Sequence, residues 1–346
     1  MRLLFILILF SSGVSAQIGT GQWRLHIPSQ IAGDVVALSD RVFTAFDNGV
    51  SEYDYSSSEL TTWDVVTGLS DITISCLGHS SSTNSVFIGY ENGNIDHIRN
   101  NEVTNIPAID LAEIQGSKKI YKIVEHEEYM YFATGFAIVK IDPIKNEVRD
   151  TYYPTNGNQS IVDVEFRNDT IFALTEVLMY TGDINNVALA DPSQWTVDTR
   201  VPTLSSNEYR EIAKVNNELF ILYVDEAYGL DTVYHLTSAG LDTTMSESFT
   251  MEISAIDNID GKLGVNYQGA TITYNINYTQ DLIIANYGFG TAHASRVHYR
   301  DGIHWIADSK VGLVKVEGGS MENITFSGPP KNDFYSMDWS RGKLAI

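Results

Sequence analysis

The feature that most constrains the fold of this chain is a short hairpin pattern that recurs along it. Residues Val86–Tyr90 form a run of alternating apolar positions that is followed by Asn92-Gly93. An Asn-Gly pair readily takes the positive φ angles that a tight hairpin turn requires. The segment Val42–Val50 repeats this pattern, with Asn48-Gly49 at the same spacing from its first valine. The pattern predicts a repeated β-hairpin, which specifies an architecture but no chemistry.

Similar short apolar runs continue at nearly even intervals to the end of the chain. They begin at Met130, Ile171, Leu219, Leu263 and Ile303, with a last one at Leu344. A period of about 40–50 residues built from short strands is typical of a β-propeller. The sequence therefore predicts an all-β fold, a seven-bladed β-propeller over residues 17–320. The innermost strands of its blades are expected to include Val35–Leu38, Ile72–Leu77, Ile120–Val124, Ile161–Val164, Tyr209, Ile253–Ile256 and Ala294–Val297.

Both ends of the chain carry further organisation. Residues 1–16 combine a basic start, a short apolar core and the small residues Val14-Ser15-Ala16, which is the pattern of a secretory signal peptide. We expect an exported protein whose mature chain begins at Gln17. The strand predicted at Gln22–Ile27 resembles the outer strand around Trp63, so we expect it to close the last blade of the ring. After the turn-rich Ser327–Asn332, the runs Tyr335–Trp339 and Gly342–Ile346 are predicted to be the first two strands of a new blade. Residues 321–346 are therefore expected to begin a second, truncated propeller.

Composition narrows the classes of function. The chain has 22 basic and 44 acidic residues, a net charge of −22. Nucleic acids and bare anionic membranes both require a basic surface, so neither is expected as a partner. Lys118-Lys119 is the only adjacent basic pair outside the tail. The apolar run at the start is too short to span a bilayer, and no later segment is apolar enough to do so.

No motif for catalysis or for a cofactor is present. The sequence lacks G-x-S-x-G, H-E-x-x-H and C-x-x-C. The single cysteine, Cys76, lies in an expected inner strand and is predicted to be a buried small hydrophobe. Asp257–Gly261 resembles a calcium loop only faintly and is expected to be an ordinary turn.

Two groups of residues contain histidine at spacings that raise the question of a metal site. Glu125–Glu128 is expected to be a solvated turn rather than a ligand set. His293, His298 and His304 cannot all share one face of a strand, which disfavours a three-histidine zinc site. We therefore assign no catalytic, cofactor-binding or metal-binding residue, and the ligand-binding residues stay unknown.

Several segments resemble the amino-terminal region of the PorZ family of type IX secretion system proteins. They are Ile88–Asp96, Asn105–Pro107, Gly116–Ile120, Ala133–Asp142, Asn146–Tyr153 and Leu189–Trp195. Phe136-Ala137 departs from the family pattern, in which Phe-Gly is expected. The resemblance implies two seven-bladed propellers and a β-sandwich tail domain, of which this chain would supply the first propeller.

The resemblance also implies a function. Proteins of this family lie on the outer membrane surface with a sortase-like partner and help to deliver anionic lipopolysaccharide, to which the sortase attaches secreted cargo. The expected function is thus a non-enzymatic scaffold in a cell-surface secretion complex, with no binding residues transferred to this chain. Two alternatives stay open: the sensor propeller of a two-component regulator, and an extracellular propeller enzyme that acts on polysaccharide.

Overall fold

The computed structural model describes residues 30–114, 116–157, 159–225, 231–242 and 252–325, together with the backbone of Asp338–Ser340 and Lys343–Ala345. The predicted signal peptide and the strand expected at Gln22–Ile27 lie outside the described residues. Within the described residues the fold is all-β, as predicted, and the one helix is the 3-10 turn η1 (Pro192–Gln194). No helix in these ranges is long and apolar enough to cross a membrane.

The first five sheets are four-stranded antiparallel meanders, each built from consecutive strands. The first has β1 (Ala32–Ala37), β2 (Arg41–Phe46), β3 (Gly49–Asp54) and β4 (Leu60–Trp63). The second has β5 (Ile74–Ser80), β6 (Ser85–Tyr90), β7 (Ile95–Arg99) and β8 (Glu102–Asn105). The third has β9 (Ile120–His126), β10 (Tyr129–Thr134), β11 (Ile138–Asp142) and β12 (Glu147–Tyr152). The fourth has β13 (Asp163–Arg167), β14 (Thr170–Leu174), β15 (Met179–Asp183) and β16 (Thr196–Val197). The fifth has β17 (Glu208–Val215), β18 (Glu218–Val224), β19 (Thr232–Leu236) and β20 (Leu241–Asp242).

The remaining strands of the ring form one seven-stranded sheet. It contains β21 (Ile253–Ile259), β22 (Lys262–Tyr274), β23 (Gln280–Ile284), β24 (Ala292–Arg300), β25 (Ile303–Asp308), β26 (Gly312–Glu317) and β27 (Ser320–Ile324). The two halves of β22 pair with different strands, the first with β21 and the second with β23. Gln268 and Gly269, between those halves, pair with β24 and join the two parts of the sheet.

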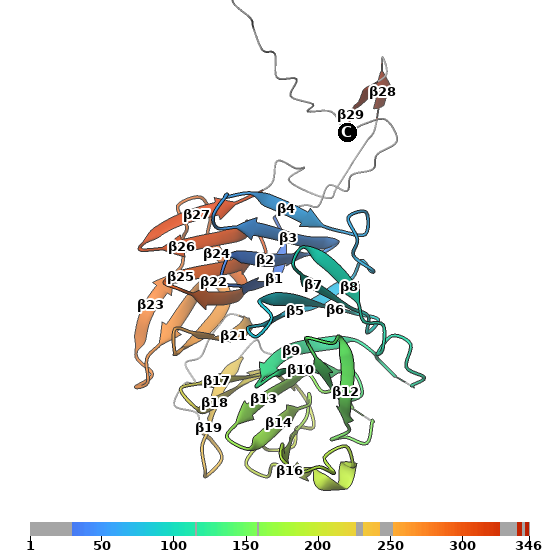
Figure 1. The fold of residues 1–346 in the computed structure, drawn as a ribbon. Helices are drawn as coiled ribbons and strands as arrows, with labels where there is room; N and C mark the ends of the chain where they lie inside the picture. The colour runs from blue at the N-terminus through green and yellow to red at the C-terminus, as the bar shows by residue number, and fades with distance from the viewer. Residues whose placement is uncertain are drawn as a thin grey trace, which may run out of the picture.

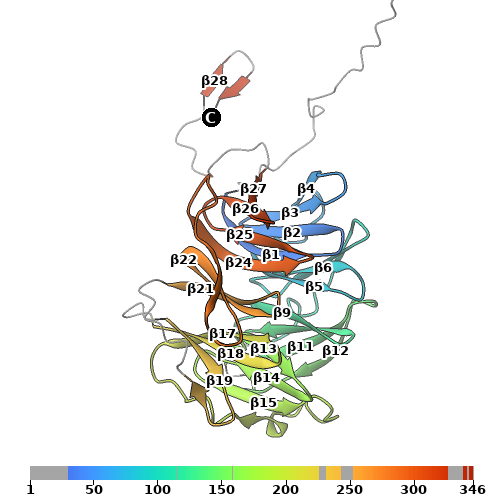
Figure 2. The same ribbon diagram turned by 90° about the vertical axis from the view of Figure 1, so that its left-hand side faces the viewer.

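The first strand of each sheet faces a common axis (Figures 1 and 2). Strands β1, β5, β9, β13, β17, β21 and β24 pack against one another in that order, and β24 packs against β1, so the cycle is closed. The hydrophobic clusters lie between neighbouring sheets; one of them joins Val36 and Phe43 of the first sheet to Leu77 and Ile88 of the second. Sheet-on-sheet burial around a ring is the arrangement of a β-propeller.

The hairpin pattern marks real turns, but the two turns differ. In the second sheet, Gly93 has φ +89° and directly follows the turn residues Glu91 and Asn92. In the first sheet, Phe46 pairs with Gly49, so the loop is Asp47-Asn48 and Gly49 already belongs to β3. The prediction that Asn-Gly itself forms the turn is therefore wrong for the first hairpin, although the strands are placed correctly.

The carboxyl-terminal boundary also differs from the expected one. Strand β27 pairs with β26 along its whole length, from Glu317↔Ser320 to Leu313↔Ile324. The last sheet thus extends to Ile324, and a boundary after residue 320 would cut through its outermost strand. Beyond it, β28 (Asp338–Ser340) and β29 (Lys343–Ala345) form the separate strand pair that the tail was expected to contain.

Candidate functional site

The candidate site is a group of charged side chains on the innermost strands, and it is built by a repeated β-bulge. Strands β1, β9, β17 and β24 each contain a register shift near their start. Asp34, Lys122, Glu211 and Arg296 come directly after those shifts. A bulge locally re-aims the side chains that follow it. Equivalent positions of different sheets therefore bring their charges to the axis of the ring.

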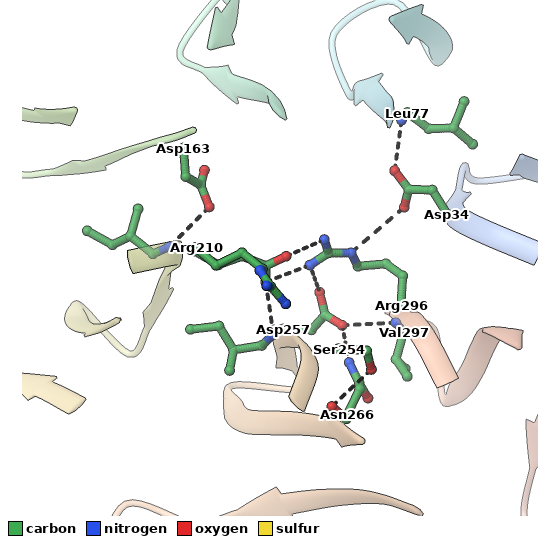
Figure 3. Close-up of polar contacts among 12 residues, drawn as sticks. Asp34, Leu77, Asp163, Arg210, Ser254, Asp257, Asn266, Arg296 and Val297 are labelled. Atoms are coloured by element: carbon green, nitrogen blue, oxygen red, sulfur yellow. Dashed lines mark hydrogen bonds and ion pairs between the residues drawn. The ribbon is translucent and has the colours of Figure 1, made fainter. Parts of the chain in front are cut away.

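Arg296 is at the centre of this group (Figure 3). Its Nη2 donates to Oε1 of Glu211 at 2.6 Å, and its Nη1 donates to Oε2 of the same carboxylate at 3.0 Å. Nη1 also donates to Oδ1 of Asp257 at 3.1 Å, and Nε lies 4.0 Å from Oδ1 of Asp34. Bidentate pairing of arginine with a carboxylate is among the strongest polar contacts in proteins. One guanidinium thus joins strands β1, β17, β21 and β24.

The carboxylates also tie four of the innermost strands, β1, β13, β17 and β21, to the next one along the ring. Asp34 accepts a hydrogen bond from the backbone N–H of Leu77 at 2.8 Å, and Asp163 accepts one from Ile212 at 3.0 Å. The same contact recurs from Glu211 and from Asp257. Glu211 accepts from the N–H of Ile256 and Asp257 from the N–H of Val297, both at 2.9 Å. The charged cluster therefore has a structural role, because it links neighbouring sheets by hydrogen bonds.

The pKa values within the cluster follow from burial and from this charge pattern. Burial opposes ionisation of Glu211, but Arg296, Lys122 and the N–H of Ile256 together outweigh it and hold the pKa of that carboxyl below its usual range. Burial raises the pKa of Asp163 to about 7, with Lys122 acting against the shift. Burial and Arg296 oppose the charge of Lys122, yet Asp163, Glu211 and Asp257 outweigh them and its pKa is raised. The site thus combines two stable cations with an excess of carboxylates, one of which titrates near neutral pH.

A polar cavity of about 280 Å³ opens beside the cluster. Its lining includes Lys122, Asp163, Glu176, Arg210 and Tyr121. Acidic and basic groups are mixed in this lining, so the cavity presents hydrogen-bond donors and acceptors together. No three-group set suited to metal binding occurs there or elsewhere among the described His, Cys, Asp and Glu residues.

The residues weighed from the sequence lie away from this cluster or serve the fold. Cys76 is on β5 with its Sγ 3.7 Å from the carbonyl oxygen of Ile120, and burial raises the pKa of its thiol to about 12. The prediction of a buried small hydrophobe is confirmed. Asp260 and Gly261 both have positive φ and form the turn between β21 and β22, which confirms an ordinary turn. Asp257, which precedes that turn, was missed as a partner of Arg296.

The acidic run Glu125–Glu128 is divided between two roles. The carboxylate of Glu125 accepts hydrogen bonds from the N–H of Ser81 at 2.8 and 2.9 Å, and the ring of His126 stacks on Phe166 at 4.0 Å. Glu127 has φ +54° in the turn between β9 and β10. The predicted turn is therefore limited to Glu127 and Glu128, because Glu125 and His126 end β9, and Glu125 bonds to the neighbouring sheet instead of facing only solvent.

The three histidines of the last sheet do not converge. His293 has its Nδ1 3.0 Å from the carbonyl oxygen of Thr291, while the ring of His304 lies 5.0 Å from that of Tyr299. His298 instead lies beside His79 of β5, with ring centres 5.1 Å apart. The three rings thus have different neighbours.

The predicted basic pair is already engaged by the chain itself. Nζ of Lys118 donates to the carbonyl oxygen of Asp110. Nζ of Lys119 lies 2.8 Å from Oε1 of Glu91 and 5.2 Å from the centre of the Tyr121 ring. Neither ammonium group is left without a partner.

A signal for the charged cluster was present in the sequence. Asp34, Lys122, Asp163, Glu211 and Arg296 each interrupt an apolar strand at its start and recur with the period of the hairpins. Aligning the predicted inner strands would have revealed a recurring charge. Which charges pair could not be read from that alignment, because the sign varies from sheet to sheet.

Part of the sequence and the fold as a whole are similar to known proteins. Residues 42–196 match the family model of the type IX secretion system PorZ N-terminal β-propeller domain. No curated protein sequence matches the chain significantly. The solved structure of PorZ, an essential bacterial surface component of the type IX secretion system of the human oral-microbiomic Porphyromonas gingivalis, is similar with a TM-score of 0.75 and 22% identity. The match covers 93% of this chain and 42% of that one, so the chain spans less than half of PorZ.

A second structure shares the architecture alone. The WD40 β-propeller domain of Doa1 has a TM-score of 0.56 and 11% identity, over 84% of this chain and 93% of that one. At such low sequence identity, a shared fold does not indicate a shared function. The family match over residues 42–196, with the fold shared with PorZ, confirms the resemblance predicted from the sequence: this chain is similar to the PorZ N-terminal β-propeller.

Proposed function

We propose that this chain acts as a non-enzymatic scaffold in a cell-surface complex of the type IX secretion system, which attaches secreted cargo to anionic lipopolysaccharide. The observation that carries the proposal is the PorZ family match over residues 42–196. The charged cluster supports a scaffold role, because Glu211 and Asp257 are both committed to Arg296 and to backbone N–H groups. These groups rigidify the ring, and a rigid ring presents its loops to partners.

The proposal includes the organisation of the longer protein. We take the ring to have seven blades, one for each innermost strand of the closed cycle. Residues 1–16 act as a signal peptide, and a second propeller begins after Ile324. The strand predicted at Gln22–Ile27 would add to the closure of the last blade, beside β27. Deleting residues 17–28 then lowers the melting temperature, whereas an unchanged melting temperature would argue against this closure.

The proposed partners are proteins of the attachment complex, including its sortase-like member, at the outer membrane surface. A net charge of −22 disfavours an anionic ligand on this ring. The only adjacent basic pair outside the tail is already occupied, since Lys119 pairs with Glu91 and Lys118 with the backbone of Asp110. Contact with anionic lipopolysaccharide is therefore assigned to other domains of the longer protein.

Co-purification from cells tests the scaffold. Tagged full-length protein, the ring alone and a full-length form lacking residues 30–324 are compared for retention of the sortase-like partner. The ring should retain the partner, and its deletion should weaken the complex. If neither occurs, the scaffold role of this domain is wrong. Cleavage of polysaccharide by the isolated ring would favour the enzyme alternative, and a transmembrane helix and kinase in the continuing sequence would favour the sensor.

A further inference from the structure

Two imidazoles from distant parts of the chain face each other at the axis of the ring. His79 is on β5 and His298 is on β24, and their ring centres lie 5.1 Å apart with an angle of 67° between the planes. Strand β1 packs against both β5 and β24, so it separates their sheets (Figure 2). His298 lies two positions beyond Arg296 on the same strand and therefore points to the same side. The pair is thus a product of ring closure.

Neither imidazole makes a hydrogen bond to another described residue. Among the described residues, His97, His235 and His293 have hydrogen-bond partners for their ring nitrogens, whereas no such contact engages His79 or His298. Some polar side-chain atoms of the described chain are fully buried and have no hydrogen-bond partner, such as Thr44 Oγ1 and Arg300 Nε. The ring nitrogens of His79 and His298 are not among these atoms, so they are not fully buried. The imidazole nitrogens therefore contact open space at the axis and are accessible to a small solute.

We propose that His79 and His298 together bind one borderline transition-metal ion of the Zn²⁺ class, with water completing its coordination. Imidazole is a preferred ligand of Zn²⁺, Cu²⁺ and Ni²⁺. With metal–nitrogen distances of about 2.1 Å, two imidazoles on one tetrahedral ion place their ring centres about 5 Å apart. The observed separation of 5.1 Å meets this condition.

The surrounding side chains affect how tightly the pair binds a metal ion and which ions it prefers. Burial lowers the pKa of both imidazoles and keeps them in the neutral form that binds metals. The negative charge of Glu125 favours a positive charge at His79, whereas the positive charge of Arg300 disfavours one at either imidazole. Nε of Arg300 lies 3.4 Å from Oδ2 of the exposed Asp301 but makes no hydrogen bond to it. With only two protein ligands and a nearby guanidinium, the affinity is expected to be modest, and hard oxygen-seeking ions such as Mg²⁺ should not compete.

The test is a Zn²⁺ titration of the purified chain by calorimetry, followed in parallel by ¹⁵N NMR of the histidine rings. The acidic surface will bind some Zn²⁺ weakly, so the double variant His79→Gln with His298→Gln supplies the background. His293→Gln and His304→Gln are matched controls in the same sheet as His298. Melting temperatures establish that each variant is folded.

One saturable site per chain above the background is expected, with the ring signals of His79 and His298 moving together. Either single glutamine variant should weaken that site at least tenfold, and the two controls should leave it unchanged. A wild-type titration identical to that of the double variant would overturn the proposal. So would a site that persists in the double variant or that shifts only His293 and His304. If a variant of the pair fails to fold, the NMR response of the wild-type rings decides the question by itself.

Discussion

Replacing Arg296 by methionine tests whether the charged cluster holds the ring closed. Methionine keeps much of the side-chain volume but removes the three hydrogen bonds to Glu211 and Asp257. These side chains are mostly shielded from water, with exposed fractions of 20% for Arg296, 10% for Glu211 and 11% for Asp257. Removing one partner of a buried ion pair costs about 3–5 kcal/mol, because the other charge stays buried without compensation. For a domain of this size, that loss corresponds to a fall of about 5–8 °C in melting temperature.

The pH dependence of this deficit gives a second readout. In the wild type, Arg296 helps to hold the pKa of Glu211 below its usual range, so this group stabilises the fold above its unfolded pKa and loses that effect as pH falls. In the variant, burial is opposed only by Lys122 and the N–H of Ile256, so the pKa of Glu211 is higher than in the wild type. The variant therefore gains relative stability as the pH falls and Glu211 takes up a proton. The deficit should be larger at about pH 8 than at about pH 5.

Arg210→Met is the matched control. Arg210 pairs with Glu208 at 2.6 Å but is 34% exposed, and such surface pairs contribute about 0–1 kcal/mol. Both variants are compared with the wild type by urea unfolding at the two pH values. If Arg296→Met is no less stable than Arg210→Met, or if its deficit does not depend on pH, the cluster does not close the ring as argued.

Three further outcomes are expected. Burial raises the pKa of Asp163 to about 7, so the folded wild type loses stability as pH rises from about 4 to 7. Asp163→Asn has no such titration, although its amide cannot accept from the N–H groups of both Val164 and Ile212, so its stability deficit against the wild type, measured by denaturant unfolding, should be smaller at about pH 8 than at about pH 4; a deficit independent of pH would contradict the burial argument. Cys76, with its thiol pKa raised to about 12, should resist a thiol-specific reagent in the native protein and react after denaturation; rapid native labelling would show that β5 opens. Gly93→Ala should lower the free energy of unfolding by about 1–3 kcal/mol, because φ is +89° and a Cβ would lie 2.7 Å from Cγ2 of Ile109. Gly302→Ala is the control, since Gly302 has φ +85° but open space around it, and it should cost less. Equal effects of the two substitutions would refute the packing argument.

Much of the fold follows from local pattern. Alternating apolar side chains placed β6 and its partners, and their even recurrence predicted a ring of hairpins. Turn residues at the ends of those runs marked the boundaries, except where Gly49 proved to be the first residue of a strand. Such features are encoded within a few neighbouring residues, which is why they can be read without tertiary structure.

The sequence by itself therefore determined the class of fold, the inert cysteine of β5 and the absence of familiar catalytic motifs. It did not determine the candidate site. Arg296 meets Glu211 from 85 residues away, and His298 meets His79 only because β24 and β5 both pack against β1. Contacts at the axis depend on the order and angle at which whole sheets pack around the ring. Charges on inner strands can be located in the sequence, but ring closure decides which of them pair and which imidazoles are left free.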